Sequence, residues 1–256
     1  QEEAWVNISV NDSNNISLGT WLQSGSPVVA EIMANAGFEW VAADLEHAAI
    51  DWGMFSHFVR AVSRHGAKPY ARVAENSVMA IRKALDCGAL GIIVPLVNNA
   101  QDAKKAVSAA KYPPEGIRGF AFCQANEWGD QFDQYVALAN DEVRLLVMVE
   151  SKEAVEHIDE ILSVKGVDGV FIGPYDLSGS YGIIGQTSHP SIVQAKEKVV
   201  SACKKHGKTA GQHIVLPTKE NIKEAIEMGY SFMALGMDTV FISNSARNIL
   251  SSVEGE

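Results

Sequence analysis

The stretch "WVAADLEHAAID" at residues 40–51 joins an apolar, strand-like run to groups that carry proton chemistry, namely Asp44, Glu46 and His47. If the apolar part is buried, these charged groups lie at the edge of the core, where burial is costly unless the charge is paired or used. His47 can act as a general base oriented by an acid such as Asp44 or Asp86, although a lone histidine is more often structural. Strict alternation puts His47 on the face opposite Asp44 and Glu46, so it joins their site only if the strand has already turned.

Two more acids, Glu150 and Asp176, follow apolar runs that are typical of strands. Carboxylates at neighbouring strand ends repel each other unless a cation or a proton lies between them, and oxygen ligands suit a hard ion such as Mg²⁺ or Mn²⁺. The alternative is that each acid caps the element that follows it. Arg72 lies in an apolar strand, where it can hold a carboxylate or an oxyanion, or else form a structural salt bridge.

The "GPYD" turn at residues 173–176 offers a second kind of anion site. Tyr175 and Asp176 can present backbone N–H groups at the start of a short helix. Pro174 has no N–H to present.

These residues must be positioned by an alternation of short apolar runs and helix-patterned segments that continues along the chain. Eight strands alternating with helices indicate an α/β protein with a (β/α)₈ barrel. A doubly wound sheet is the alternative, but no GxGxxG follows the first strand. We expect strands at residues 17–23, 39–46, 68–74, 90–97, 144–150, 169–174, 209–215 and 232–238, and helices at 26–37, 51–66, 77–89, 99–112, 151–166, 190–207 and 218–230.

Active sites of such barrels lie at the carboxyl ends of the strands, and polar side chains gather there in this sequence. The strand-end residues are Asp44, Arg72, Glu150, Asp176, Gln212, His213 and Asp238. The longest irregular stretch, residues 112–134, is of a length that is usually functional in a compact domain. We expect a flexible lead-in at residues 1–15 and a single domain over residues 16–256.

Composition restricts the partners and the compartment. The formal net charge of −10 argues against non-specific binding of nucleic acid or anionic membranes. The apolar runs are too short to span a bilayer. The three cysteines show no zinc spacing and no disulfide framework, which favours a reducing cytoplasm.

Several longer motifs add a resemblance that covers the chain from about residue 18 to about residue 250. They are "LGTWLQSGSPVVAEIMANAGFEW", "DLEHAAID", "ALDCGALGIIVPLVNNAQDA", "YPPEGIRG", "VESKEAV" and "GVDGVFIGPYDLSGSYGIIGQTSHP". With them the chain resembles the HpcH/HpaI family of metal-dependent class II pyruvate aldolases, which includes 4-hydroxy-2-oxoheptanedioate and 2-dehydro-3-deoxyglucarate aldolases.

The resemblance implies a modified TIM barrel of the phosphoenolpyruvate/pyruvate type. It also implies a homohexamer, built as a trimer of dimers, in which protomers exchange their C-terminal helices and help to complete each other's sites. The implied activity is that of a class II aldehyde-lyase, which reversibly cleaves a 4-hydroxy-2-oxo acid to pyruvate, or a similar 2-oxo acid, and an aldehyde.

The resemblance also assigns residues to roles. Glu150 and Asp176 would bind a divalent cation (Mg²⁺, Mn²⁺ or Co²⁺), and His47 would be the base, made more basic by Asp86. The implied catalytic residues are His47, Arg72, Asp86 and Asp44. The implied substrate-binding residues are Arg72, Gly173, Tyr175, Asp176, Met148 and Trp21. These roles suit the chemistry, because an arginine and a divalent ion can both stabilise an enolate.

Two positions depart from the family pattern. Met148 stands where many relatives carry a glutamine, and Gln124 stands where many carry an arginine. The loss of a positive charge at Gln124 predicts a less anionic distal end of the substrate, or a reduced or altered activity. The alternatives to an aldolase are therefore a related metal-enolate carbon–carbon lyase, an oxaloacetate decarboxylase, or a non-catalytic protein that binds 2-oxo acids.

Overall fold

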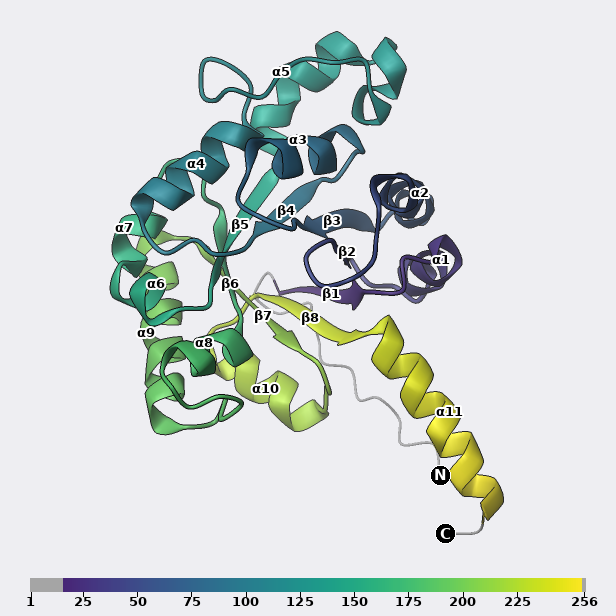
Figure 1. Cartoon of the computed structure of the whole chain (residues 1–256), viewed down its shortest axis with the longest axis vertical. Coiled ribbons are helices and arrows are strands. Elements are labelled where there is room, and N and C mark those ends of the chain that lie inside the picture. The colour runs from purple at the N-terminus through teal and green to yellow at the C-terminus, as the bar shows by residue number, and fades with distance from the viewer. Residues whose placement is uncertain (1–15, 255–256) are drawn as a thin grey trace.

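The computed structural model describes residues 16–254, whose eight parallel strands form a closed barrel (Figure 1). Each strand pairs with the next one in the sequence, and the last strand pairs with the first. The predicted (β/α)₈ barrel is therefore confirmed, and the lead-in predicted at residues 1–15 lies outside the described residues. The strands are β1 (Ser17–Leu22), β2 (Trp40–Asp44), β3 (Lys68–Arg72), β4 (Gly91–Val94), β5 (Arg144–Val149), β6 (Gly169–Ile172), β7 (Thr209–Ile214) and β8 (Phe232–Met237).

The helices begin where the sequence provides capping residues. The Ser26 and Ser77 side chains accept hydrogen bonds from the backbone N–H groups of Val29 and Ala80, which the helix itself leaves unpaired. The segment predicted as one helix over residues 151–166 is two, because His157 leaves helical geometry. The helices are α1 (Pro27–Asn35), α2 (Trp52–Ser63), α3 (Val78–Asp86), α4 (Ala100–Ala110), α5 (Phe132–Glu142), α6 (Lys152–Glu156), α7 (Ile158–Leu162), α8 (Pro174–Ser180), α9 (Pro190–His206), α10 (Lys219–Met228) and α11 (Asp238–Glu254).

The stretch from residue 112 to residue 134 has more structure than its sequence indicates. It contains a short 3₁₀ segment, η1 (Gln124–Gly129), and the start of α5. The buried Arg118 holds it in place: its Nη2 donates to Asp86 at 2.9 Å, and its guanidinium lies over the rings of Tyr112 and Tyr135. Because this anchor joins segments far apart in the sequence, no local pattern predicts it.

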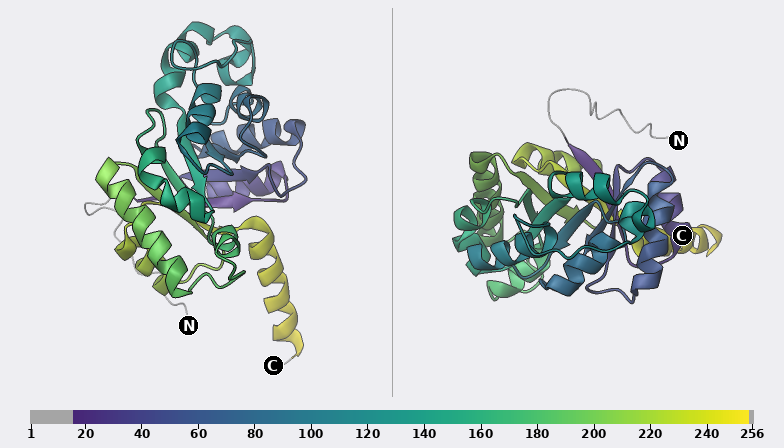
Figure 2. Two further views of the ribbon diagram at one scale, coloured as in Figure 1. Left: turned by 60° about the vertical axis from the view of Figure 1, so that its left-hand side comes forward. Right: turned by 90° about the horizontal axis from the view of Figure 1, so that it is seen from above.

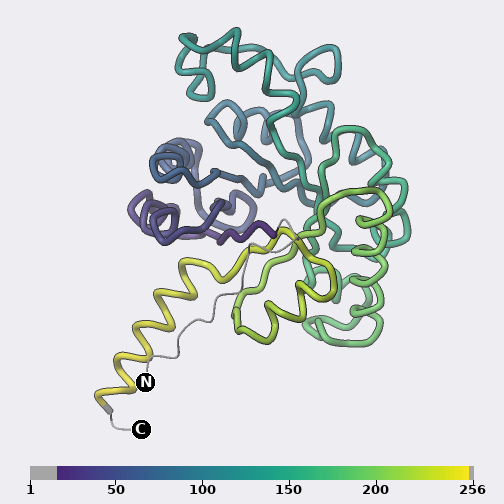
Figure 3. The backbone as a smooth tube through the Cα atoms, turned by 180° about the vertical axis from the view of Figure 1, so that it is seen from behind, coloured from purple at the N-terminus to yellow at the C-terminus, as the bar shows by residue number. Residues whose placement is uncertain are grey.

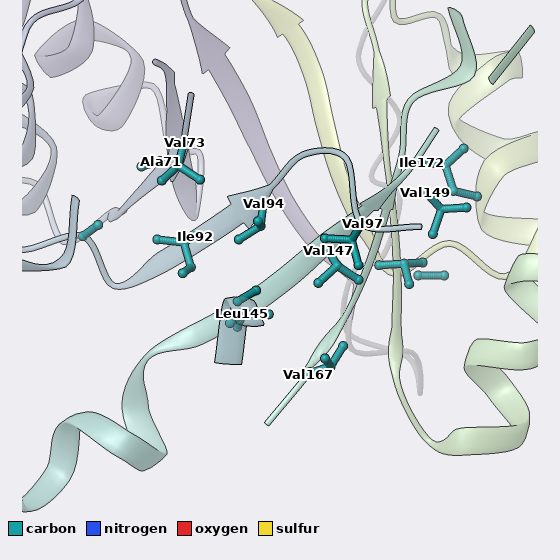
Figure 4. Packing of buried hydrophobic residues seen from close by; sticks show 14 of the residues in the cluster. Ala71, Val73, Ile92, Val94, Val97, Leu145, Val147, Val149, Val167 and Ile172 are labelled. Atoms are coloured by element: carbon teal, nitrogen blue, oxygen red, sulfur yellow. The ribbon is translucent and has the colours of Figure 1, made fainter. Parts of the chain in front are cut away.

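Two apolar layers follow from the alternation of side chains along the strands. One layer lies between the strands and the helices, and Figure 4 shows part of it, including Ile92, Val94 and Val147. The other fills the barrel and consists of Trp21, Trp40, Ala42, Tyr70, Ile93, Leu146, Met148, Phe171, Phe232 and Ala234. The large rings of this inner layer need glycine opposite them, since a Cβ on Gly19 would lie 2.0 Å from the Trp40 ring.

The last helix, α11, leaves the barrel instead of covering it (Figures 1 and 2). Figure 3 shows the same projection from behind. Apolar side chains on this helix are more than half exposed to solvent: Ile242, Ile249, Leu250 and Val253. Over residues 16–254 we find no helix long and apolar enough to cross a membrane.

Candidate active site at the carboxyl ends of the strands

A small cavity of about 110 Å³ opens at the carboxyl ends of the strands. It lies where parallel barrels place their active sites. Six of the residues that the sequence assigned to catalysis or substrate binding line it: Trp21, Arg72, Met148, Gly173, Tyr175 and Asp176.

A buried ion pair between Asp44 and Arg72 forms one wall of the site. The register of β2 and β3 places these residues side by side. Arg72 Nε donates to Asp44 Oδ1 at 3.0 Å and Nη2 to Oδ2 at 2.5 Å, which is the two-point geometry that a guanidinium prefers. Burial by itself raises the pKa of Asp44, but Arg72, with help from Gln23, outweighs it and brings the pKa to about 2. The Asp44 carboxylate is therefore charged and fixes the arginine.

Asp44 also shapes the turn that carries the predicted base. β2 ends at Asp44, whose Oδ1 accepts the backbone N–H groups of Glu46 at 3.2 Å and His47 at 3.0 Å. The condition set by the sequence, that the chain turns before His47, is met. The exposed His47 side chain has its Nε2 3.9 Å from Glu46 Oε2, and Glu46 lies 3.4 Å from Arg72 Nη1.

Asp86 is not brought to His47 within one chain. Asp86 is the last residue of α3, and a nine-residue helix carries its end about 13 Å from its start, away from the strand ends. Its carboxylate pairs with Arg118, and no contact with His47 is present among residues 16–254. In this chain the acidic neighbour of His47 is Glu46, so a role for Asp86 at His47 stays a prediction that requires a second protomer.

Glu150 follows β5 and is held by a backbone contact. Its Oε1 accepts the N–H of Leu96 at 2.7 Å, and Leu96 adopts a φ of 56°, an uncommon value for a residue other than glycine. Across from it, a Cβ on Gly173 would lie 3.3 Å from Oε2. Burial raises the pKa of Glu150, and the negative charges of Glu46 and Asp176 raise it further.

Asp176 lies exposed in the first turn of α8, directly after the end of β6. Burial is the main cause that raises the pKa values of Glu150 and Glu46, and the charge of Asp176 raises both further, so the three carboxylates lie close enough to repel one another. Carboxylate oxygens that repel one another in this way fit a divalent cation. Among residues 16–254 no group of three or more histidine, cysteine or acidic side chains is arranged to hold a metal ion, so the binding of a cation by Glu150 and Asp176 stays a prediction.

His213 is a residue of the site to which the sequence gave no role beyond its place at a strand end. It lines the cavity, stacks on Trp21 with ring centroids 5.2 Å apart, and its Nε2 lies 2.9 Å from the Gly236 carbonyl oxygen. Burial, followed by the positive charge of Arg72, lowers the pKa of His213 to about 4. The alternation of β7 could have indicated this position, because Gly211 and His213 share the inward face.

The two departures from the family pattern differ in their surroundings. Met148 is buried in the barrel and lines the cavity, so it replaces a polar group with an apolar one. Gln124 is used within its own chain: Oε1 accepts from Ser56 and Arg60, each at 2.6 Å, and Nε2 donates to the Cys87 carbonyl at 2.8 Å. Gln124 therefore ties η1 to neighbouring helices rather than lining this cavity.

Comparison with known proteins agrees with this geometry. The family model described as HpcH/HpaI aldolase/citrate lyase matches residues 17–245. The chain is 39% identical over 239 residues to a 2-dehydro-3,6-dideoxy-6-sulfogluconate aldolase from Pseudomonas putida, covering 93% of this chain and 92% of that protein. It is 38% identical over 232 residues to a 2-keto-3-deoxy-L-rhamnonate aldolase from Escherichia coli, covering 90% and 86%. The solved structure of an HpcH/HpaI aldolase/citrate lyase family protein from Burkholderia cenocepacia matches with a TM-score of 0.90 at 30% identity, covering 96% and 97% of the two chains.

Proposed function

Because the chain belongs to the HpcH/HpaI aldolase/citrate lyase family, we propose that it is a divalent-metal-dependent aldolase that reversibly cleaves a 4-hydroxy-2-oxo acid to pyruvate and an aldehyde. The observation that carries this proposal is the buried Asp44–Arg72 pair at the rim that also holds Glu150 and Asp176. In this arrangement one fixed guanidinium lies beside carboxylates whose mutual repulsion a cation would relieve.

The reaction has two requirements. When the C3–C4 bond breaks, its electron pair stays on the three-carbon fragment as an enolate, while the C4 hydroxyl loses its proton and becomes the aldehyde carbonyl. The enolate then takes a proton at C3 and becomes pyruvate. The site must therefore stabilise an oxyanion and supply a base.

Arg72 suits the first requirement. Two of its five N–H groups are held by Asp44, so the guanidinium cannot turn away. Nη1 lies 3.4 Å from Glu46 Oε2 without a hydrogen bond between them, so its donors remain for the oxyanion. A divalent ion held by Glu150 and Asp176 would supply an electrophile for the keto and carboxylate oxygens. The N–H groups of Tyr175 and Asp176, in the first turn of α8 where a helix leaves donors unpaired, suit the carboxylate.

His47 suits the second requirement. It sits on the turn that Asp44 holds, next to Glu46, and its exposed imidazole can exchange protons with solvent. We assign the C4 hydroxyl proton to this residue.

We also propose that the protein assembles as a hexamer by exchange of α11 and acts in the cytoplasm. The exposed apolar residues of α11 support the exchange, since an uncovered apolar helix face is costly in water. The three cysteines are free, as is usual in a reducing compartment.

The test of this function is the exchange of pyruvate methyl protons for deuterium, followed by NMR. It requires no knowledge of the aldehyde. We expect exchange with Mn²⁺ or Mg²⁺ and none with EDTA. Glu150→Gln and Asp176→Asn should each reduce the exchange rate at least about 100-fold, the usual range for loss of one strong electrostatic contribution.

Glu153→Gln provides the matched control, because Glu153 is an exposed acid in the next helical turn. It should exchange like the wild type. Full exchange by Glu150→Gln, or exchange that survives EDTA, would contradict the proposed metal pair.

A further inference from the structure

His213 stands at a junction between two cavities. It lines the 110 Å³ cavity at Arg72 and also a larger cavity of about 380 Å³ on the side of α10. The two cavities share Pro174, Tyr175, His213 and Val215. A substrate whose 2-oxo acid end lies near Arg72 and Asp176 can therefore extend its aldehyde end past His213.

The imidazole is held in one orientation and one tautomer. The Gly236 carbonyl can only accept, so Nε2, 2.9 Å away, must carry the proton and donate it. The stack on Trp21 fixes the plane of the ring. Burial lowers the pKa of His213 to about 4, so the ring is neutral near pH 7. With the proton on Nε2, Nδ1 is unprotonated and can only accept.

Nδ1 is free to meet a ligand. No hydrogen bond to Nδ1 is present among residues 16–254. Nor is it one of the fully buried polar atoms that lack a partner in this part of the chain. An unpartnered atom that is not fully buried, on a residue that lines two cavities, reaches open space in them.

We infer that His213 is a specificity-determining residue that accepts a hydrogen bond from a hydroxyl group of the aldehyde, so that the enzyme prefers hydroxylated aldehydes. This inference rests on the proposed aldolase function. An acceptor without a proton pairs with a hydroxyl donor and disfavours a carboxylate or a bare alkyl group at the same place.

The test compares two aldehydes with one carbon skeleton, glyceraldehyde and propanal, in condensation with pyruvate. His213→Phe keeps an aromatic ring for Trp21 and His213→Leu keeps an apolar side chain in the cavity, and neither has an acceptor in place of Nδ1. Both variants should lower the ratio of kcat/KM for glyceraldehyde over propanal about tenfold, the value of one neutral hydrogen bond. The change in this ratio between proteins cancels the intrinsic reactivity of the aldehydes.

His206→Gln is the matched control, since His206 lies on α9 and pairs with Asp159. It should keep the wild-type ratio. An unchanged ratio in both His213 variants would overturn the inference. If kcat/KM falls equally for both aldehydes, the ratio is unchanged and the residue has a structural role. Methyl exchange of pyruvate by the wild type is measured in parallel: its absence would overturn the proposed function itself, whereas its presence with an unchanged ratio would overturn only the role of His213.

Discussion

At the scale of single residues, Asp44 organises the site. Its two carboxylate oxygens accept from Arg72, from the Gln23 amide and from the backbone of the turn at Glu46 and His47. A fully buried carboxylate with this many donors is stabilised in its charged form. One side chain thus fixes both the arginine and the turn that carries the predicted base.

Asp44→Asn should show this dependence. The amide has nearly the same shape but leaves the Arg72 charge without its buried partner, which typically costs about 3 kcal/mol of unfolding free energy. Urea unfolding measures the loss, and methyl exchange should fall with it. Asp51→Asn is the control, because asparagine caps α2 as well as aspartate does. Equal urea midpoints for Asp44→Asn and the wild type would argue against the pair.

His213 predicts a pH dependence of stability. Burial and the Arg72 charge hold its pKa at about 4, although Asp44 and the Gly236 carbonyl act in the opposite direction, whereas the unfolded chain titrates near 6.5. The unfolded state therefore binds the proton first as the pH falls. The stability from neutral His213 is complete above pH 6.5 and is lost as the pH falls toward 4, by roughly 3 kcal/mol. Urea unfolding at pH 7.5 and 4.5 should show a smaller loss for His213→Phe than for the wild type, and equal losses would contradict it.

At the scale of elements, the strands position the site through their register and their alternation. Pairing of β2 with β3 sets Asp44 beside Arg72, and pairing of β5 with β6 leads to Glu150 opposite Gly173. Below these residues the aromatic inner layer leaves no room for extra atoms. The rings of Trp40, Tyr70 and Phe232 lie within 4.1 to 5.5 Å of one another between centroids.

Gly91→Ala tests this packing. A Cβ at Gly91 would lie 2.0 Å from Tyr70 Cε1, and the Tyr70 ring cannot move because its neighbours confine it. We expect a loss of about 1–3 kcal/mol in unfolding free energy, measured by urea unfolding. Gly179→Ala in α8 is the control, since no atom lies within 4 Å of its Cβ position. A Gly91→Ala protein as stable as this control would show that the rings in the barrel interior can move to accept the added methyl group.

At the scale of the whole molecule, α11 is the helix that the barrel of its own chain leaves mostly exposed. It projects from the barrel (Figures 1, 2 and 3). Its apolar side chains at Ile242, Ile249, Leu250 and Val253 are exposed to water. A second protomer that received this helix would cover those residues. It would also provide the interface that Asp86 needs in order to act on a His47 of another chain.

Leu250→Glu should weaken this assembly. A charge in the face of α11 that the proposed exchange would cover opposes its burial, so light scattering after gel filtration should show a smaller species than the hexamer proposed for the wild type. Asn248→Glu places the same charge at an exposed polar position of the same helix and should leave the mass unchanged. A monomeric wild-type protein would contradict the proposed exchange.

The sequence by itself determined the local features. Short apolar runs between helix-patterned segments predicted all eight strands and most helices. Polar residues at the ends of these runs predicted the rim that holds Asp44, Arg72 and Asp176, because both patterns lie within a few residues of the sequence. Only the tertiary structure decided which distant groups meet. It paired Asp86 with Arg118, and it fixed the tautomer of His213 through Gly236. The physical reason is that burial, charge and a shared proton depend on atoms from elements far apart in the chain. A local sequence pattern does not give the distances between such atoms.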